Sequence, residues 1–266
     1  MPSRAPRPDW NMPPPRDIQV LGARVTYYEA GQGPVIVLLH GFSGSADFEW
    51  GRIYDALAET HRVIAVQHVG FAPSERPAIP YDNESMARYL GGFFEALGLS
   101  DFTLVGESFG GWAVTNYAAR AEALGLPAIG RLVIVGGAVG QIKPPKPDAR
   151  GFVSDEVAAE VDGYLQRAQI YDHDETRMAI MRESGLGKGD PDTAALRRIR
   201  VPTLLIWGDQ DELIPLAVGE AAARVFPNAR LAVLKDVGHI PSIETPLEFV
   251  QLLETFVAGG WPEGEL

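Results

Sequence analysis

The segment at residues 106–111, Gly-Glu-Ser-Phe-Gly-Gly, constrains this chain more than any other stretch. It follows an apolar run at 102–105 and precedes a helix-forming run at 112–123. This order predicts a strand, a very tight turn and a helix, with Ser108 at the apex. A serine hydroxyl is a weak nucleophile at neutral pH, so a turn that lifts it towards a base would suit nucleophilic catalysis. The flanking glycines let strand and helix approach where a side chain would clash.

A Gly-x-Ser-x-Gly segment taken alone has two interpretations. It fixes only three positions, and the chain contains 29 glycines, so an ordinary glycine-rich turn would give the same letters. The choice depends on whether the rest of the chain supplies a sheet, a base and an acid in suitable places.

The composition is that of an ordinary globular protein and excludes several classes. Of the 266 residues, 46% are hydrophobic and 22% are charged, and the chain is long enough to bury a full core. It has no apolar run of about 18 residues that would span a membrane. The absence of cysteine excludes disulfides, cysteine nucleophiles and thiolate metal sites. Nucleophilic catalysis by a serine requires neither a metal nor a cofactor, and we expect none. A net charge of −12 argues against nucleic acid or an anionic membrane as a partner.

The first 16 residues form a segment of their own. They contain six prolines and three arginines, and they lack the apolar centre of a secretory signal. We therefore predict an extended or flexible arm at residues 1–16 and a cytoplasmic protein.

Strand and helix patterns alternate along most of the remaining chain. Two short β-favouring runs, 18–21 and 24–29, predict an antiparallel hairpin. The later apolar runs predict buried strands at 34–39, 62–66, 102–105, 131–135, 202–207 and 230–234. Helical patterns lie at 53–59, 83–97 (capped by Asp82), 112–123, 216–225 and 246–257. This alternation predicts an α/β fold with a doubly wound, mostly parallel sheet.

Residues 141–198 interrupt this alternation. A proline-rich stretch is followed by three short helical patterns, at 154–169, 174–183 and 192–198. We interpret the segment as an insertion between strands, so that residues 17–140 and 199–266 form the core domain.

Only one of the five histidines fits the role of a base for Ser108. In a doubly wound sheet the active groups lie in loops at the carboxyl ends of strands. His61 precedes a strand, and His173 lies in the insertion. His40 stands in a His-Gly turn, where a bond that holds the loop is the plainer role, and His68 is a weak competitor. His239 follows the last predicted strand in a short, glycine-containing loop, and we predict it as the base.

The acid is predicted in the loop after the strand at 202–207. By itself this loop, with Asp209 and Asp211, is typical of a solvated turn. Together with Ser108 and His239 it completes the chain order serine, acid, histidine. We select Asp211 because it lies further out along the loop, whereas Asp209 is suited to bonding its own turn. Asp236 lies on the same loop as His239 and is a poorer candidate.

Two backbone N–H groups are predicted to bind the oxyanion that develops in acyl transfer. Phe109 supplies one because it follows the nucleophile directly, and Phe42 supplies the other from the loop after the strand at 34–39. The phenylalanine rings either line an acyl pocket or pack in the core. Trp112 is a third candidate for contact with substrate.

Four motifs in this order resemble the α/β-hydrolase fold family, over about residues 18–258. They are His40-Gly41-Phe42, the segment 106–111, Trp207-Gly208-Asp209-Gln210-Asp211, and Gly238-His239-Ile240-Pro241 with Glu244-Thr245-Pro246. The resemblance implies Ser108 as nucleophile, Asp211 as acid, His239 as base, and oxyanion donors at Phe42 and Phe109. It also implies that residues 141–198 form a helical cap.

One stretch departs from the family's pattern. The family commonly has Asp-x-x-Gly-x-Gly-x-Ser after the strand that corresponds to 62–66, but here Gln67 replaces the acid and Ala72 the second glycine. A role for the pair Gln67-His68 is left open. The serine at the turn disfavours relatives that use aspartate there, such as haloalkane dehalogenases and epoxide hydrolases.

These residues lead to three hypotheses. The first is hydrolysis of small or medium carboxylic esters through an acyl-enzyme. The second uses the same triad to cleave a carbon–carbon bond in a ring-fission diketone, and the third is a ligand receptor that has kept the fold. Such diketones often carry carboxylates, for which the local cations are Arg76, Arg150, Arg177 and Arg182. Residues 148–192 hold eleven acids against five bases, which favours a neutral ester.

Overall fold

The computed structural model describes residues 12–42, 45–142, 176, 179–180 and 189–262. Most of the predicted cap, 141–198, and of the predicted arm, 1–16, lies outside the described residues. At the end of the arm, Arg16 is already the first residue of a strand, and Met12 packs against the core.

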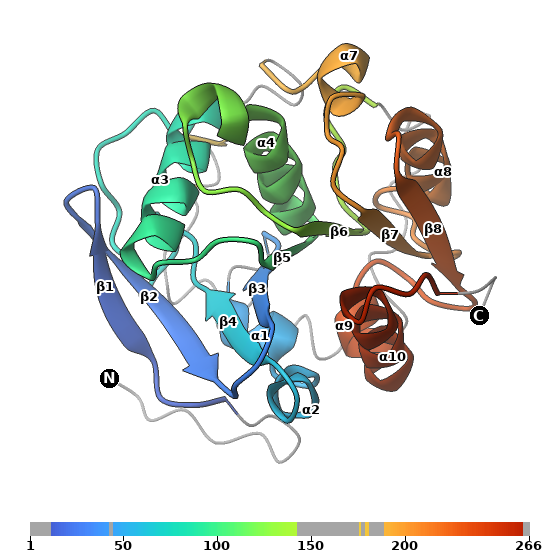
Figure 1. The fold of residues 1–266 in the computed structure, drawn as a ribbon, viewed down its shortest axis with the longest axis horizontal. Helices are drawn as coiled ribbons and strands as arrows, with labels where there is room; N and C mark the ends of the chain where they lie inside the picture. Colours follow the sequence, from blue (N-terminus) through green and yellow to red (C-terminus); the bar gives the residue numbers. More distant parts are fainter. Residues whose placement is uncertain (1–11, 43–44, 143–175, 177–178, 181–188, 263–266) are drawn as a thin grey trace.

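One eight-stranded sheet organises the molecule, in the order β1-β2-β4-β3-β5-β6-β7-β8 (Figure 1). Strand β2 pairs antiparallel with both β1 and β4, and strands β3 to β8 pair in parallel. The predicted hairpin and the mostly parallel sheet are therefore confirmed. The strands are β1 (Arg16–Val20), β2 (Ala23–Ala30), β3 (Val35–Leu39), β4 (Arg62–Val66), β5 (Thr103–Glu107), β6 (Arg131–Val135), β7 (Thr203–Gly208) and β8 (Ala229–Leu234).

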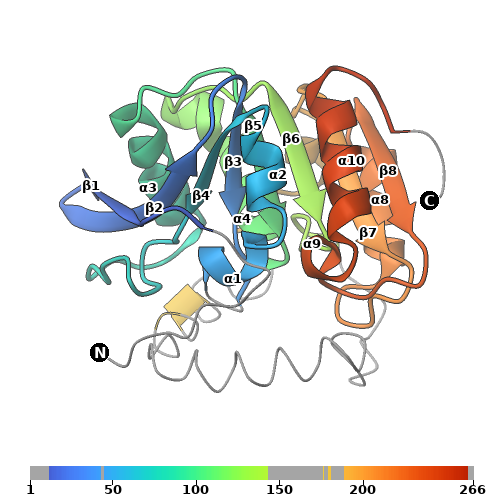
Figure 2. The ribbon, with the colours of Figure 1, turned by 90° about the horizontal axis from the view of Figure 1, so that it is seen from below.

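Helices cover both faces of the sheet (Figures 1 and 2). One face carries α3 (Asn83–Ala96), α4 (Phe109–Leu124) and α8 (Leu216–Val225). The other carries α1 (Ala46–Trp50), α2 (Tyr54–Ala58), α9 (Pro241–Glu244) and α10 (Pro246–Val257). Strand β3 divides its side chains between the two cores: Val37 and Leu39 belong to one, Ile36 and Leu38 to the other. Successive side chains on a strand point to opposite faces, which explains why these strands are apolar throughout.

Two short helices were missed by the sequence prediction. Helices α1 and α9 have five and four residues, too few to show a helical period. Helix α4 also begins three residues earlier than predicted, at Phe109, because the turn feeds directly into it. Helix α3 has the predicted cap, with the Asp82 carboxylate accepting a hydrogen bond from Ser85 N–H at 2.8 Å. Within the predicted helix at 192–198, the structure has α7 (Thr193–Leu196).

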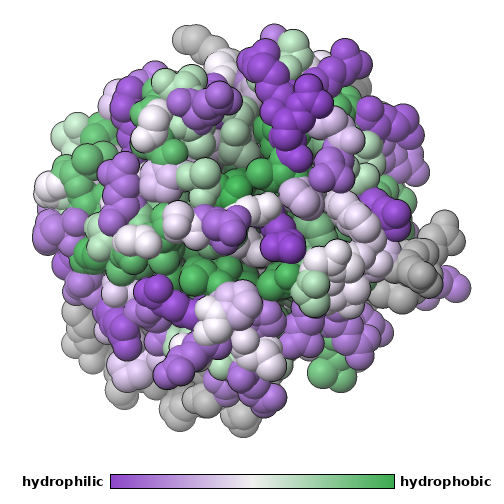
Figure 3. All heavy atoms as spheres, viewed as in Figure 1, coloured by the Kyte–Doolittle hydropathy of each residue, from purple (hydrophilic) through white to green (hydrophobic). Residues whose placement is uncertain are grey.

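The parallel strands end at one common edge of the sheet, where the segments that carry the predicted site residues meet (Figure 2). The face shown in Figure 3 is mainly hydrophilic, with a band of hydrophobic residues across its middle. Among the described residues, none of the helices combines the length and apolar character needed to cross a membrane.

Candidate active site

The turn that carries Ser108 is strained and sterically crowded. Ser108 has φ +55° and ψ −115°, and its N–H donates to the Val135 carbonyl at 2.9 Å. A Cβ at Gly106 would lie 2.2 Å from the Gly110 carbonyl oxygen, and one at Gly110 would lie 2.0 Å from that of Leu39. Neither position admits a side chain, so both glycines are needed for strand β5 and helix α4 to meet at this angle.

The structure brings Ser108, His239 and Asp211 into one hydrogen-bonded row. His239 Nδ1 lies 2.9 Å from Asp211 Oδ2, and His239 Nε2 lies 2.9 Å from Ser108 Oγ. Because a carboxylate only accepts, Nδ1 carries the hydrogen, which leaves Nε2 to accept from the serine hydroxyl. The three residues come from the ends of β5, β8 and β7.

Hydrogen bonds to backbone N–H groups hold Asp211 and the loop of His239 in place. The second carboxylate oxygen of Asp211 accepts from the N–H groups of Leu213 at 3.0 Å and Ile214 at 2.9 Å. Glu244 accepts from the N–H groups on either side of His239, from Gly238 at 2.9 Å and Ile240 at 3.0 Å. The sequence comparison placed Glu244 in a motif but gave it no role. The sequence signal for this role was that Glu244 lies five residues after His239, at the end of the short helix that follows it.

The rejected acids lie elsewhere. Asp236 is exposed. Asp209 Oδ1 is buried without a hydrogen-bond partner, so this atom does not make the expected bond to its own turn.

The aromatic rings near Ser108 pack on one another. Phe42 and Phe109 stack at 4.3 Å between centroids and 6° between planes, and Phe109 stacks on Trp112 at 5.1 Å and 19°. Phe109 is thus enclosed on both faces, and it is only 6% exposed. The Phe109 ring is thus packed, and Phe42 is half-buried at the edge of the stack. Contact of these rings with an acyl group stays a prediction.

The indole of Trp112 is also occupied. Its Nε1–H donates to Asp190 Oδ1 at 2.8 Å, and the same oxygen accepts from Asn83 Nδ2 at 2.7 Å. Asn83 also donates to Asn116 Oδ1 at 2.6 Å. This cluster ties the segment that begins at Gly189 to helices α3 and α4. Trp112 therefore offers substrate no hydrogen-bond donor.

His40 and His68 clamp the ends of β3 and β4 together. His40 Nδ1 lies 2.7 Å from the Gly41 carbonyl, and His40 Nε2 accepts from the His68 N–H at 3.2 Å. His68 Nε2 in turn lies 3.0 Å from the His40 carbonyl. Because carbonyls only accept, His40 carries its hydrogen on Nδ1 and His68 on Nε2. Neither ring makes a hydrogen bond with Ser108, so the structural role expected of His40 agrees with these contacts.

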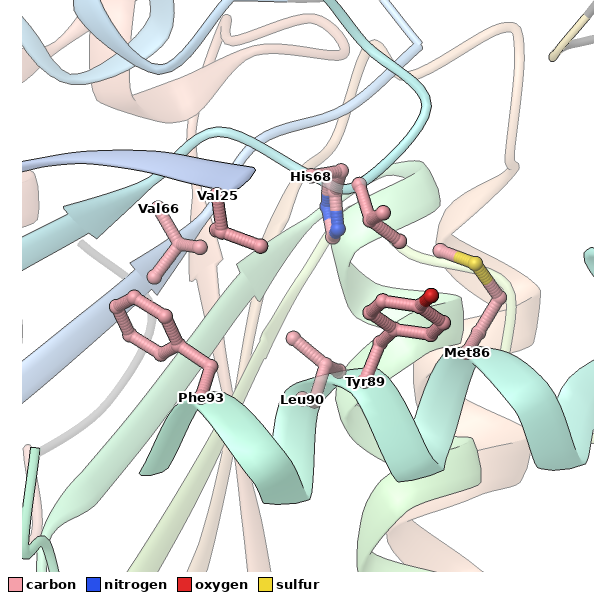
Figure 4. Close-up of a pocket in the computed structure, with 8 residues that line it drawn as sticks. Val25, Val66, His68, Met86, Tyr89, Leu90 and Phe93 are labelled. Atoms are coloured by element: carbon pink, nitrogen blue, oxygen red, sulfur yellow. The ribbon is translucent and has the colours of Figure 1, made fainter. Parts of the chain in front are cut away.

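The remaining nitrogen of His68 faces an apolar environment. His68 lines a cavity of about 10 Å³ together with side chains of β2, β4 and α3 (Figure 4). This volume is at the lower limit for a single water molecule. Nδ1 is buried without a hydrogen-bond partner. Burial lowers the pKa of His68 to about 4, and the bond to the His40 carbonyl acts in the opposite direction.

The departure at Gln67 has a physical reason. Its side-chain oxygen accepts from the Ala46 N–H at 2.9 Å, and its Nε2 donates to the Ala72 carbonyl at 2.9 Å. An ionised carboxylate cannot donate, so an amide suits this site better than the acid that is common in the family. Among the residues that the structure describes, no group of three or more His, Asp and Glu side chains could hold a metal ion.

Comparison with known proteins adds to this geometry. A model of the alpha/beta hydrolase family matches residues 36–252. The 2-hydroxy-6-oxo-6-(2'-aminophenyl)hexa-2,4-dienoic acid hydrolase of Metapseudomonas resinovorans is 26% identical, over 91% of this chain and 90% of that protein. A meta-cleavage product hydrolase of Pseudomonas fluorescens IP01 has a similar structure, with a TM-score of 0.79 and 22% identity over 92% of this chain and 98% of that one. The Bacillus subtilis carboxylesterase CesB gives a TM-score of 0.72 at 21% identity, over 93% and 92% of the two chains.

Proposed function

This chain belongs to the alpha/beta hydrolase family, and on that premise we propose that it is a serine hydrolase of small or medium neutral carboxylic esters. The observation that carries the proposal is the row from Asp211 through His239 to Ser108, with both hydrogen bonds at 2.9 Å. A nucleophile, a base within reach of it and an acid that orients the base are what acyl transfer requires.

The reaction proceeds through an acyl-enzyme. His239 Nε2 takes the proton of Ser108 as Oγ attacks the ester carbonyl carbon, and the oxyanion accepts hydrogen bonds from the N–H groups of Phe42 and Phe109. Each such donor contributes about 3 kcal/mol to transition-state stabilisation. His239 then gives the proton to the leaving alkoxide as the carbon–oxygen bond breaks. Water repeats the sequence and releases the carboxylic acid and free Ser108.

The charges around the site support a neutral substrate. Among the described residues, no Arg or Lys makes a hydrogen bond or ion pair with the triad. The carboxylate of Asp190 accepts from Trp112 beside the aromatic stack, and the nearby cation Arg120 already donates to Asn116 Oδ1 at 2.7 Å. In the sequence, residues 148–192 contain eleven acids and five bases, a net negative charge that would disfavour an anionic substrate if this segment forms the cap. We further propose that residues 141–198 form a cap whose side chains select the acyl group.

A second candidate is hydrolytic cleavage of a carbon–carbon bond in a ring-fission diketone. It is favoured by the names of the relatives, one of which acts on a dienoic acid and another on a meta-cleavage product. A carboxylate on such a substrate would need a cation. Arg150, Arg177 and Arg182 of the predicted cap lie outside the described residues, and Arg76 lies in the loop after β4.

One set of assays separates these functions. The purified protein is labelled with a fluorophosphonate probe and assayed with p-nitrophenyl esters of graded acyl length, beside a ring-fission diketone. We expect labelling and ester turnover, with both lost in Ser108→Ala and turnover lower by at least about 1,000-fold. Faster cleavage of the diketone than of every ester would favour the second candidate. No labelling of the folded wild-type protein would indicate a receptor instead of an enzyme.

A further inference from the structure

Two carboxyl groups outside the triad are buried beneath Ser108. Glu107, the residue before the nucleophile, is 0% exposed, and Glu49 on α1 is 2% exposed. Carboxyl groups are almost never fully buried unless they are paired or hydrogen-bonded, so the contacts of this pair call for an explanation.

The partner of Glu107 is Ser242, on the short helix that follows His239. Ser242 Oγ lies 2.5 Å from Glu107 Oε2, and Ser242 N–H donates to Glu107 Oε1 at 3.3 Å. Ser242 Oγ also lies 3.2 Å from the carbonyl oxygen of Glu49. A serine hydroxyl has one hydrogen, and it cannot serve both oxygens. If Glu107 carries a proton, its O–H donates to Ser242 Oγ, and Ser242 O–H is free to donate to the Glu49 carbonyl.

The surroundings favour this protonated form. Burial raises the pKa of Glu107 well above its ordinary value, the charge of Glu49 raises it further, and the hydrogen bonds from Ser242 act in the opposite direction. Other ionisable groups on the neighbouring elements are Asp47, buried on α1, and Glu244 on α9, which also raises the pKa of Glu107. Arg52 follows α1 and donates to the Ile243 carbonyl at 2.7 Å.

Glu49 reaches the third segment of the site. Its Oε1 accepts from the Gly41 N–H at 2.6 Å, directly before Phe42, the proposed oxyanion donor. The two buried carboxyl groups thus link three segments of the site. Glu49 contacts the oxyanion loop at Gly41, and Glu107, next to the nucleophile, contacts Ser242 after the loop of the base.

We propose that Glu107 is a positioning residue that works as a neutral carboxylic acid, holding the His239 loop against the Ser108 turn through Ser242 while Glu49 holds the oxyanion loop. This inference rests on the proposed serine hydrolase reaction. Glu107 touches neither substrate nor the reacting atoms; it sets the relative positions of the groups that do.

Kinetics of three variants test the role of the neutral acid. A glutamine at 107 reproduces both contacts, because its carbonyl accepts from Ser242 N–H and its amide donates to Ser242 Oγ. We expect Glu107→Gln to keep kcat within about threefold of wild type, since one neutral hydrogen-bond donor replaces another. Glu107→Ala and Ser242→Ala should lower kcat by about 10- to 100-fold through misplacement, with little change in KM. Equal losses in Glu107→Gln and Glu107→Ala, or no loss in Ser242→Ala, would overturn the proposal. If Glu107→Ala does not fold, the comparison of kcat between Glu107→Gln and Ser242→Ala tests the proposal.

A stability measurement tests the protonation state without using activity. A folded protein that keeps Glu107 protonated, while the unfolded chain ionises it above a pKa of about 4.3, loses stability as pH rises. Glu107→Gln should therefore gain in Tm over wild type as pH rises from 4.5 to 8, whereas the exposed control Glu220→Gln should not. A difference that is constant with pH would refute the neutral acid. This outcome is independent of the proposed function, which is tested separately by turnover and probe labelling of wild type and Ser108→Ala.

Discussion

His239 and the pair His40–His68 lie at the same edge of the sheet, each at or just after the end of a strand, yet their surroundings differ. His239 has a carboxylate on Nδ1 and a serine hydroxyl on Nε2. His40 uses both ring nitrogens on backbone groups, and His68 uses one on a carbonyl and buries the other in an apolar cavity. A base needs one oriented nitrogen and one that can exchange a proton with substrate. A position after a strand is thus insufficient to identify the base. The hydrogen-bond partners of both ring nitrogens distinguish the base from a structural histidine.

The largest expected effect breaks this comparison directly. His239→Gln should lower kcat for a p-nitrophenyl ester by about 1,000,000-fold, because among the described residues no other base is hydrogen-bonded to Ser108 Oγ. His68→Gln is the matched control, and per folded molecule it should lose less than about tenfold. Circular dichroism of both variants checks folding. Comparable losses in the two folded variants would show that the contacts do not distinguish the roles of the two histidines.

A smaller effect is expected from the acid that orients His239. Asp211→Asn should lower kcat by about 10,000-fold, because an amide that donates to Nδ1 stabilises the wrong tautomer. Asp209→Asn, two residues away, is the control, since the buried Asp209 Oδ1 has no hydrogen-bond partner. Steady-state kinetics of both variants provide the measurement. A larger loss of kcat in Asp209→Asn than in Asp211→Asn would show that Asp209, and not Asp211, orients His239.

The smallest effect concerns stability instead of turnover. Burial lowers the pKa of His68 to about 4. The unfolded chain, with a histidine pKa of about 6.5, then binds more protons between these values, so stability is lost as pH falls from 6.5 to 4. The shift corresponds to at most about 3 kcal/mol. Urea unfolding at several pH values should show a shallower acid loss in His68→Leu than in wild type. An unchanged slope would mean that His68 does not titrate as its burial implies.

Much of the site followed from local patterns. The glycines at 106 and 110 were predicted to allow close approach, and the structure has carbonyl oxygens where their Cβ atoms would stand. Position relative to a strand eliminated His61, and the His-Gly turn made a structural role the plainer one for His40. Helix α10 was predicted with its observed bounds because its apolar period is long. Helices α1 and α9 were not predicted, although they carry Glu49 and Ser242.

Partners of buried polar groups could not be predicted in this way. Glu107 and Ser242 are separated by 135 positions, and Trp112 and Asp190 by 78. No spacing rule links such residues. Their pairing depends on which side chains the fold brings together after the backbone has found its place, and each buried group must then take the partner that is present.

Local sequence patterns therefore predicted the sheet, the turn that presents Ser108 and the chain order of serine, acid and histidine, because sterics and periodicity act between near neighbours. Only the folded chain shows which histidine nitrogens are bonded to backbone groups, that the ring of Phe109 is packed, and that the carboxyl groups of Glu107 and Glu49 are both buried near the nucleophile. These outcomes depend on burial and hydrogen bonding between distant segments, which exist only once the chain is folded.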